Sequence, residues 1–365
     1  MTDATYVVWF DDCDKSSTRD VGGKCASLGE LIRAELDVPS GFAVTTTAHR
    51  LFLDRNDLRR RESELLESLD YEDMGALQTA SEALRSLVEE AVLPPEVATS
   101  VRERYAELAA RGGSDGAPVA VRSSALAEDM ATASFAGQLQ TFLWIEGEDA
   151  VVEHIRRCWS GFFTPEALAY RKRLEIPEDD ALMSVGVQRM VDARSAGVMF
   201  TLNPVNGDRS KIMIESAWGL GETVVSGAVN PDRFLVDKVT LDILERTIGS
   251  KDREQRFDPA AGALVEAMVD DERRAASSLA DDEIHEIARL GKQIERLYGS
   301  PQDVEWAIDP EGGLFLLQAR SETVWSRRER PPLVEKSGSA LDYVLADLLS
   351  RAPGAPNDVP TGDGA

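Results

Sequence analysis

A predicted β-hairpin near the end of the chain limits its possible folds more than any other segment. Residues 303–308 and 314–318 are β-rich, and Asp-Pro-Glu-Gly-Gly at 309–313 is typical of the turn between two antiparallel strands. This pairing places Glu305 on one arm across from Gln318 on the other, with both side chains on one face. The chain therefore contains a sheet that brings polar side chains from two strands together.

The polar residues of this hairpin predict a metal site. A carboxylate and an amide oxygen are hard donors, and they suit Mg²⁺ because this ion takes one or two protein ligands and completes its shell with water and phosphate oxygens. We therefore expect Glu305 and Gln318 to bind Mg²⁺. Arg320 follows Gln318 by two positions and points to the same face. The alternative is an ordinary Glu/Arg pair on an edge strand.

The rest of the chain alternates helical and β-rich segments, which predicts an α+β fold. Pro94 and Pro95 interrupt the long helical stretch 54–111, so that it forms at least two helices and has the pattern of a helical insertion. Strands are expected over residues 6–10, 41–45, 185–191, 196–201, 211–217 and 233–237 and within 118–144, and helices over 24–35, 148–173 and 258–298.

Lys24 follows two glycines at the expected start of a helix. Free backbone N–H groups and the helix dipole favour an anion at such a junction, and the ammonium group adds a point charge. The segment is not a Walker A motif, because Thr18 stands in place of its first glycine and Cys25 follows the lysine. Lys24 is a candidate phosphate ligand, and a turn followed by a surface lysine is the alternative.

Arg122 follows an expected strand and precedes a loop of small and hydroxyl residues that includes Thr132, Gly137 and Gln138. Such a loop can close its backbone N–H groups over a polyphosphate while the guanidinium group binds the oxygens in a fork. A surface loop next to an arginine that pairs with a helix is the alternative.

A third candidate segment contains Gln188, Met190 and Val191 at the end of an expected strand. A backbone at this position can hydrogen-bond the edge of a purine between apolar side chains, although a core strand explains the same pattern. A second Gly-rich turn follows in residues 215–222, which begin with Glu215.

The composition excludes several classes of protein. The chain has 40 Lys and Arg against 65 Asp and Glu, a net charge of −25, which argues against binding to nucleic acid or to an anionic membrane. The first twelve residues carry acids where a signal peptide needs bases, and no apolar run reaches about 18 residues, so we expect a cytoplasmic protein. The three cysteines and three histidines have no metal-ligand spacing, so that any metal must use oxygen ligands.

In this order, the segments resemble the ATP-binding domain, of the ATP-grasp type, at the N-terminus of phosphoenolpyruvate synthase, pyruvate phosphate dikinase and rifampin phosphotransferase. The resemblance covers about residues 6–324. The matching segments are residues 22–31, 121–125, 134–138, 197–201, 215–222, 301–307 and 318–320.

The resemblance implies a two-lobed ATP-grasp fold with helical insertions and ATP between the lobes. The lobes would comprise residues 1–184, with the insertion at about 54–111, and residues 185–325. A linker, an amphipathic helix and a disordered tail are expected over residues 326–365.

The resemblance also implies roles for single residues, with Lys24, Arg122 and Arg320 as the catalytic ones. It assigns the phosphates to Lys24, Arg122, Thr132, Gly137 and Gln138, adenine and ribose to Gln188, Met190, Val191 and Glu215, Mg²⁺ to Glu305 and Gln318, and charge on the transferred group to Arg320.

Full-length relatives also carry a swivelling domain with a phosphohistidine in a Gly-Gly-rich segment, followed by an acceptor-binding domain. None of His49, His154 and His285 lies in such a segment. We therefore expect a separate partner subunit with both domains, as in phenylphosphate synthase and alkylphenol-phosphorylating enzymes, although a piece of a longer enzyme is the alternative.

The expected function is transfer of the ATP β-phosphoryl group to the partner's histidine, with release of AMP and phosphate. A phenol or alkylphenol is the first choice of final acceptor. The alternatives are the ATP-grasp part of a phosphoenolpyruvate synthase or rifampin phosphotransferase, and a non-catalytic adenine-nucleotide-binding module.

Overall fold

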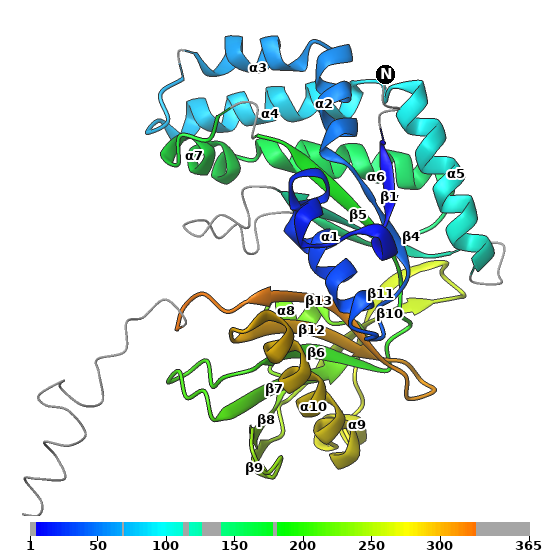
Figure 1. Cartoon of the computed structure of the whole chain (residues 1–365), viewed down its shortest axis with the longest axis vertical. Helices are drawn as coiled ribbons and strands as arrows, with labels where there is room; N and C mark the ends of the chain where they lie inside the picture. The colour runs from blue at the N-terminus through cyan, green and yellow to red at the C-terminus, as the bar shows by residue number, and fades with distance from the viewer. Residues whose placement is uncertain (1–4, 68, 112–116, 126–139, 178–180, 326–365) are drawn as a thin grey trace, which may run out of the picture. The chain divides into compact units, whose positions relative to one another are not determined.

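The computed structural model describes residues 5–67, 69–111, 117–125, 140–177 and 181–325 (Figure 1). The described residues up to Glu322 form one compact unit, and Thr323 and the residues after it are assigned to a second one. The first unit contains helices and sheets, which confirms the predicted α+β class. Every helix in the described ranges is too short or too polar to span a lipid bilayer. The linker, helix and tail expected over 326–365 lie outside the described residues.

The first sheet of this unit has five antiparallel strands. Both of its faces are covered: Phe42 and Val44 belong to one hydrophobic cluster, whereas Ala43 between them belongs to another. This double burial explains why its central strands are almost continuously apolar. In spatial order the strands are β1 (Val7–Trp9), β2 (Gly41–Val44), β5 (Met183–Arg189), β3 (Val119–Ala125) and β4 (Thr141–Ile145).

Helices cover this sheet on both faces. The helix α1 (Thr18–Arg33) contacts β2, β3 and β5 and also β13 of the second sheet, and Figure 1 shows it between the two sheets. The helices of the expected insertion and those after β4 share the cluster of Phe42. They are α2 (Thr46–Arg55), α3 (Leu58–Leu66), α4 (Met74–Glu90), α5 (Pro95–Arg111), α6 (Glu148–Ser160) and α7 (Pro165–Arg173).

The second sheet contains the predicted hairpin. Its arms pair antiparallel, with Glu305 directly opposite Gln318 and a turn over residues 309–313, as the sequence predicts. The helix α10 (Asp281–Tyr298) contacts β6, β7 and β12. In spatial order the strands are β13 (Leu314–Ser321), β12 (Gln302–Ile308), β6 (Ser195–Phe200), β7 (Lys211–Trp218), β8 (Asp232–Asp237) and β9 (Ile243–Thr247).

The chain passes from the first sheet to the second later than the expected limit at residues 184 and 185. That limit falls inside β5, which pairs with β2 and β3 in the first sheet. The passage takes place between Arg189 and Ser195, where β6 begins. The pattern that predicts a strand over 185–191 could not reveal this, because a strand's own residues do not specify which strands it pairs with.

The helix expected over 258–298 is wrong in its first part. Residues 253–268 form a two-stranded hairpin, β10 (Arg253–Asp258) and β11 (Ala263–Met268), and the short helix α9 (Asp271–Ala275) precedes α10. The carboxylate of Asp258 accepts a hydrogen bond from the N–H of Ala260, and Gly262 has a φ of 61°. A positive φ ends a helix and favours a turn at this glycine.

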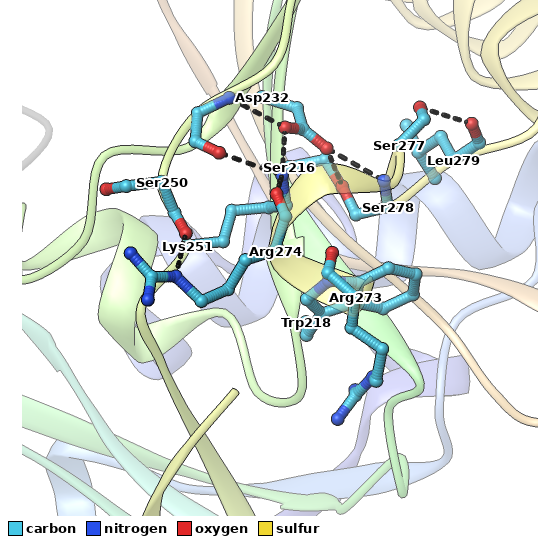
Figure 2. A network of polar contacts seen from close by, with 11 residues as sticks. Ser216, Trp218, Asp232, Ser250, Lys251, Arg273, Arg274, Ser277, Ser278 and Leu279 are labelled. Carbon is cyan, nitrogen blue, oxygen red and sulfur yellow. Dashed lines mark hydrogen bonds and ion pairs between the residues drawn. The ribbon is translucent and has the colours of Figure 1, made fainter. Parts of the chain in front are cut away.

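A fully buried ion pair connects the start of β8, residues 249–251 and the segment from α9 to Ser278 at one end of the second sheet (Figure 2). The ammonium group of Lys251 donates to Asp232 Oδ1 at 2.5 Å and to the carbonyls of Gly249 and Arg274 at 3.0 and 3.1 Å. Ser278 donates to Asp232 Oδ2 from its N–H and its hydroxyl, both at 2.7 Å. Both charged side chains are 0% exposed. Each charge is therefore solvated by the protein alone.

Replacement of Lys251 by Met should lower the free energy of unfolding by about 3–5 kcal/mol, because Asp232 would remain buried without a countercharge. Lys211→Met is the matched control: its partner Asp237 lies 2.7 Å away but both side chains are 21% exposed, so the loss should be about 1 kcal/mol or less. Urea unfolding measures both. Equal losses in the two variants would contradict this account of the buried pair.

Candidate active site

A cavity of about 500 Å³ lies where the two sheets meet. Strands β3 and β5 line it from the first sheet, and β6, β12 and β13 line it from the second, together with the short helix α8 (Glu222–Val225). One part of the lining is charged and another is apolar. Its charged residues are Lys24, Arg122, Arg189, Glu222, Glu305 and Arg320.

Lys24 reaches this cavity because α1 is broken at Gly22. This glycine has φ 68° and ψ 166°, and a Cβ there would lie 2.3 Å from the carbonyl oxygen of Ser124. Only glycine allows such a close approach with a positive φ. Lys24 follows in the resumed helix, and its Nζ donates to the carbonyl of Ser123 at 3.3 Å. The predicted glycine turn is confirmed, although α1 already begins at Thr18.

Arg122 connects the two sheets. It lies on β3, yet its guanidinium group donates to three acceptors on the β12–β13 hairpin. Nη2 donates to Glu305 Oε2 at 2.5 Å and to Gln318 Oε1 at 3.0 Å, and Nη1 donates to the carbonyl of Leu317 at 3.0 Å. The side chains of Arg122 and Glu305 are 17% and 20% exposed. The structure thus brings Arg122, which the sequence singled out in another segment, to the predicted pair of Glu305 and Gln318.

Glu305 is ionised in this setting. Burial opposes its negative charge, but the guanidinium of Arg122, together with Lys24 and Arg320, outweighs burial and holds the pKa of Glu305 below its usual value. Glu305 therefore presents a negative charge, close to several cationic side chains, to a charged ligand in the cavity.

Glu305 and Gln318 fit a divalent cation. Their Oε2 and Oε1 atoms accept from the same nitrogen of Arg122, so the two oxygens converge on one point that already holds a positive charge. A carboxylate and an amide are the donor set that Mg²⁺ takes when phosphates complete its shell. Within the described ranges no group of three or more His, Cys, Asp or Glu residues could hold a metal by itself.

The apolar part of the cavity contains the segment that was expected to bind a purine. Gln188, Met190 and Val191 line the cavity. Gln188 is 3% exposed, and its Nε2 has no hydrogen-bond partner among the residues that the structure describes. The N–H of Met190 donates to the carbonyl of Pro118 at 2.8 Å, which fixes the backbone at the end of β5. A buried amide donor beside apolar side chains suits a flat heteroaromatic ring.

Glu215 does not line the cavity, in contrast to its expected role near adenine and ribose. Its carboxylate accepts from Arg233 Nε at 2.7 Å, across from β7 to β8. The register places Glu215 on the same face of the sheet as Glu305, with Val198 of β6 between them, so Glu215 lies two strands away from the hairpin site.

Glu222, in the same Gly-rich segment, lines the cavity instead. The side chain of Glu222 is exposed, but partial loss of water around its carboxyl group, followed by the negative charge of Glu305, raises the pKa of Glu222 above its usual value of 4.5, although Arg122 opposes the shift. We did not single out Glu222 from the sequence. The only signal for it was that residues 215–222 belong to the resemblance.

Arg320 also lines the cavity, and it pairs with Asp303 across the hairpin. Its Nε and Nη2 donate to Asp303 Oδ2 at 2.8 and 2.7 Å. The expected phosphate-covering residues Thr132, Gly137 and Gln138 lie outside the described residues.

Replacement of Glu222 by Gln should stabilise the protein at pH 7. Because the native pKa is raised, the stability that neutral Glu222 contributes is present below pH 4.5 and is lost as the pH rises through the raised value. The gain from Glu222→Gln should therefore be present at pH 7 and disappear near pH 4, and it should be small because water screens this exposed side chain. Glu215→Gln, which only breaks an ion pair with Arg233, should show no such gain in thermal unfolding. Equal stability of Glu222→Gln and wild type at pH 7 would contradict the assignment.

Comparison with known proteins identifies the family. The family described as "Pyruvate phosphate dikinase, AMP/ATP-binding domain" matches residues 18–339. A probable phosphoenolpyruvate synthase of Staphylothermus marinus is 42% identical over 91% of this chain and 43% of its own length. One of Methanocaldococcus jannaschii is 40% identical over 98% and 30%, and the phosphoenolpyruvate synthase of Escherichia coli is 41% identical over 88% and 42%. The chain thus spans less than half the length of these relatives.

Among solved structures, a D-alanyl-alanine synthetase A of Vibrio cholerae aligns with 68% of this chain and 56% of its own, at 11% identity. The TM-score is 0.26, which is too low to indicate a shared fold. The family match over most of the sequence carries the identification, and the chain belongs to the pyruvate phosphate dikinase AMP/ATP-binding domain family.

Proposed function

We propose that this chain binds Mg·ATP in the cavity between its two sheets and transfers the β-phosphoryl group to a histidine supplied from outside residues 1–365. The observation that carries the proposal is the convergence of Arg122, Glu305 and Gln318 from two sheets on one point beside Lys24. Membership of an AMP/ATP-binding family supports the nucleotide. A two-lobed ATP-grasp fold, with one sheet in each lobe, is part of this proposal.

The two ends of the cavity suggest how ATP would lie. The purine would lie beside Met190 and Val191, where the unpaired amide of Gln188 can donate to a ring nitrogen. The phosphates would then extend toward Lys24 and Arg122. This direction places the polyphosphate against fixed cations, and positioned cations are the main source of catalysis in phosphoryl transfer.

The residues of the hairpin would act on the reacting oxygens. Mg²⁺ held by Glu305 and Gln318 would neutralise charge on the phosphate oxygens. Arg122 would bind two of these oxygens in a fork, and Arg320 would stabilise charge on the transferred group. Both phosphoanhydride bonds of ATP break: the α-phosphate leaves as AMP, the β-phosphoryl group bonds to a histidine nitrogen, and water takes the γ-phosphoryl group as inorganic phosphate.

The histidine that accepts the phosphoryl group would lie outside residues 1–365. His49 is 0% exposed, and burial, with Arg59 and Arg171 nearby, lowers its pKa to about 3. His154 and His285 do not line the cavity. None of the three is placed to attack a bound nucleotide. The histidine and the acceptor site would lie on a further domain or, as we expected from the sequence, on a partner subunit.

Two compounds are candidates for the final acceptor of the phosphoryl group, pyruvate and a phenol. The names of the relatives support a phosphoenolpyruvate-forming system, with pyruvate as acceptor. A phenol or alkylphenol, our first choice from the sequence, depends only on the resemblance to two-chain enzymes. A nucleotide-binding module without catalysis is disfavoured, because a sensor does not need Lys24, Arg122, Glu305 and Gln318 together.

The test combines the chain with the candidate histidine protein, Mg²⁺ and ATP labelled at the β position. We expect AMP formation and label on a partner histidine, and then phosphorylation of either pyruvate or phenol. Nucleotide binding without AMP formation would support the module and contradict the enzyme.

Single variants test the residues. Glu305→Ala should abolish Mg²⁺-dependent AMP formation, and Arg122→Ala should reduce it by at least ~10²-fold, as expected for loss of one fixed charge. Glu311→Ala, at the exposed turn of the same hairpin, is the matched control and should retain wild-type rates. Wild-type AMP formation by both cavity variants would refute the site.

A further inference from the structure

The two oxygens of the hairpin that are proposed to bind a divalent cation already accept hydrogen bonds from an arginine. Arg122 Nη2 lies 2.5 Å from Glu305 Oε2 and 3.0 Å from Gln318 Oε1, and its Nη1 lies 3.0 Å from the carbonyl oxygen of Leu317. These three acceptors lie next to one another on the hairpin, and the arginine comes from the other sheet. Both oxygens of the proposed metal site therefore accept from one guanidinium nitrogen.

A divalent cation and this guanidinium cannot use those oxygens together. The ion would have to replace Nη2 at Glu305 and Gln318, and while Arg122 stayed it would meet a like charge at short range. Such repulsion is strong at a site where side chains are about one-fifth exposed, because little water screens it. The nucleotide-free site is thus unfavourable for a metal.

A nucleotide removes this obstacle, because its phosphates offer Arg122 another partner. Guanidinium binds phosphate oxygens in a two-pronged geometry and with charge-assisted hydrogen bonds. Glu222 is the other carboxylate that lines the cavity, and because its side chain is exposed, water weakens its attraction for the guanidinium group. An arginine that turns to the phosphates leaves the oxygens of Glu305 and Gln318 open.

We propose that Arg122 and the divalent cation compete for Glu305 and Gln318, so that the metal site forms only when nucleotide phosphates hold Arg122. The inference rests on the proposed function for the identity of the site. It adds an order to binding: metal enters with the nucleotide or after it. Coupling between two ligands through one residue is reciprocal, so metal should also tighten nucleotide binding.

The experiment measures Mn²⁺ binding by the EPR signal of the free ion, without turnover. In wild type, a non-hydrolysable ATP analogue should raise Mn²⁺ affinity by about tenfold or more relative to the nucleotide-free protein, in the usual range of such couplings. Because the analogue itself chelates Mn²⁺, the Mn²⁺ bound in a titration of analogue without protein is subtracted. Nucleotide-free Arg122→Gln should already bind Mn²⁺ about tenfold more tightly than nucleotide-free wild type.

Two controls separate this site from weak binding to an acidic protein. The double variant Arg122→Gln, Glu305→Gln should lose the gained affinity. Arg233→Gln also frees a glutamate, Glu215, but outside the cavity, so its Mn²⁺ affinity should equal that of wild type. Thermal unfolding verifies that each variant is folded.

Equal Mn²⁺ affinity of nucleotide-free wild type and Arg122→Gln, together with no effect of the analogue on wild type, would overturn the competition. If Mn²⁺ binding still depended on Glu305 in that case, the metal assignment of the proposed function would stand. If replacement of Glu305 changed the Mn²⁺ affinity in no background, both the metal assignment and the competition would be refuted.

Discussion

The ion pair between Arg122 and Glu305 is the interaction on which the rest of the site depends. It joins β3 of the first sheet to β12 of the second, and it is only partly exposed. An isolated pair of this kind stabilises a protein little, because desolvation offsets its Coulomb energy. Its importance is its position: it brings the groups for phosphate and for metal to the same point of the cavity.

The surrounding fold holds this point in place from both sides. On the first sheet, the break at Gly22 lets α1 approach β3, so that Lys24 lies beside Ser123. On the second sheet, the antiparallel register sets Glu305 opposite Gln318 and Asp303 opposite Arg320. The cationic groups of the cavity are therefore concentrated, although the whole chain has a net charge of −25.

The sequence predicted the hairpin and the glycine turn well, because both depend on local chemistry. A turn of Asp, Pro and Gly fixes the register of its arms, and two glycines before a lysine indicate a change of backbone direction. It predicted the strand pairing less well. Whether β5 joins the first or the second sheet, and whether residues 258–268 form a strand or a helix, depends on neighbours distant in the chain.

In the candidate site, too, the sequence predicted the residues with a local signal but not the contacts between distant segments. Lys24, Arg122, Gln188, Glu305, Gln318 and Arg320 all line the cavity, because each belongs to a segment with its own local signal. Glu222 lines the cavity and Glu215 of the same Gly-rich segment does not, because Glu222 lies on α8 whereas Glu215 lies on β7, two strands away from Glu305 on the same face of the sheet. The direct contact of Arg122 with both expected metal ligands was also not predicted, because it crosses between sheets.

A crystal structure with Mg²⁺ and a non-hydrolysable ATP analogue tests the central claim most directly. The account predicts the purine beside Met190, the metal on Glu305 and Gln318, and the Arg122 guanidinium on phosphate oxygens. A nucleotide bound outside this cavity, or a metal bound elsewhere while Arg122 still pairs with Glu305, would contradict it.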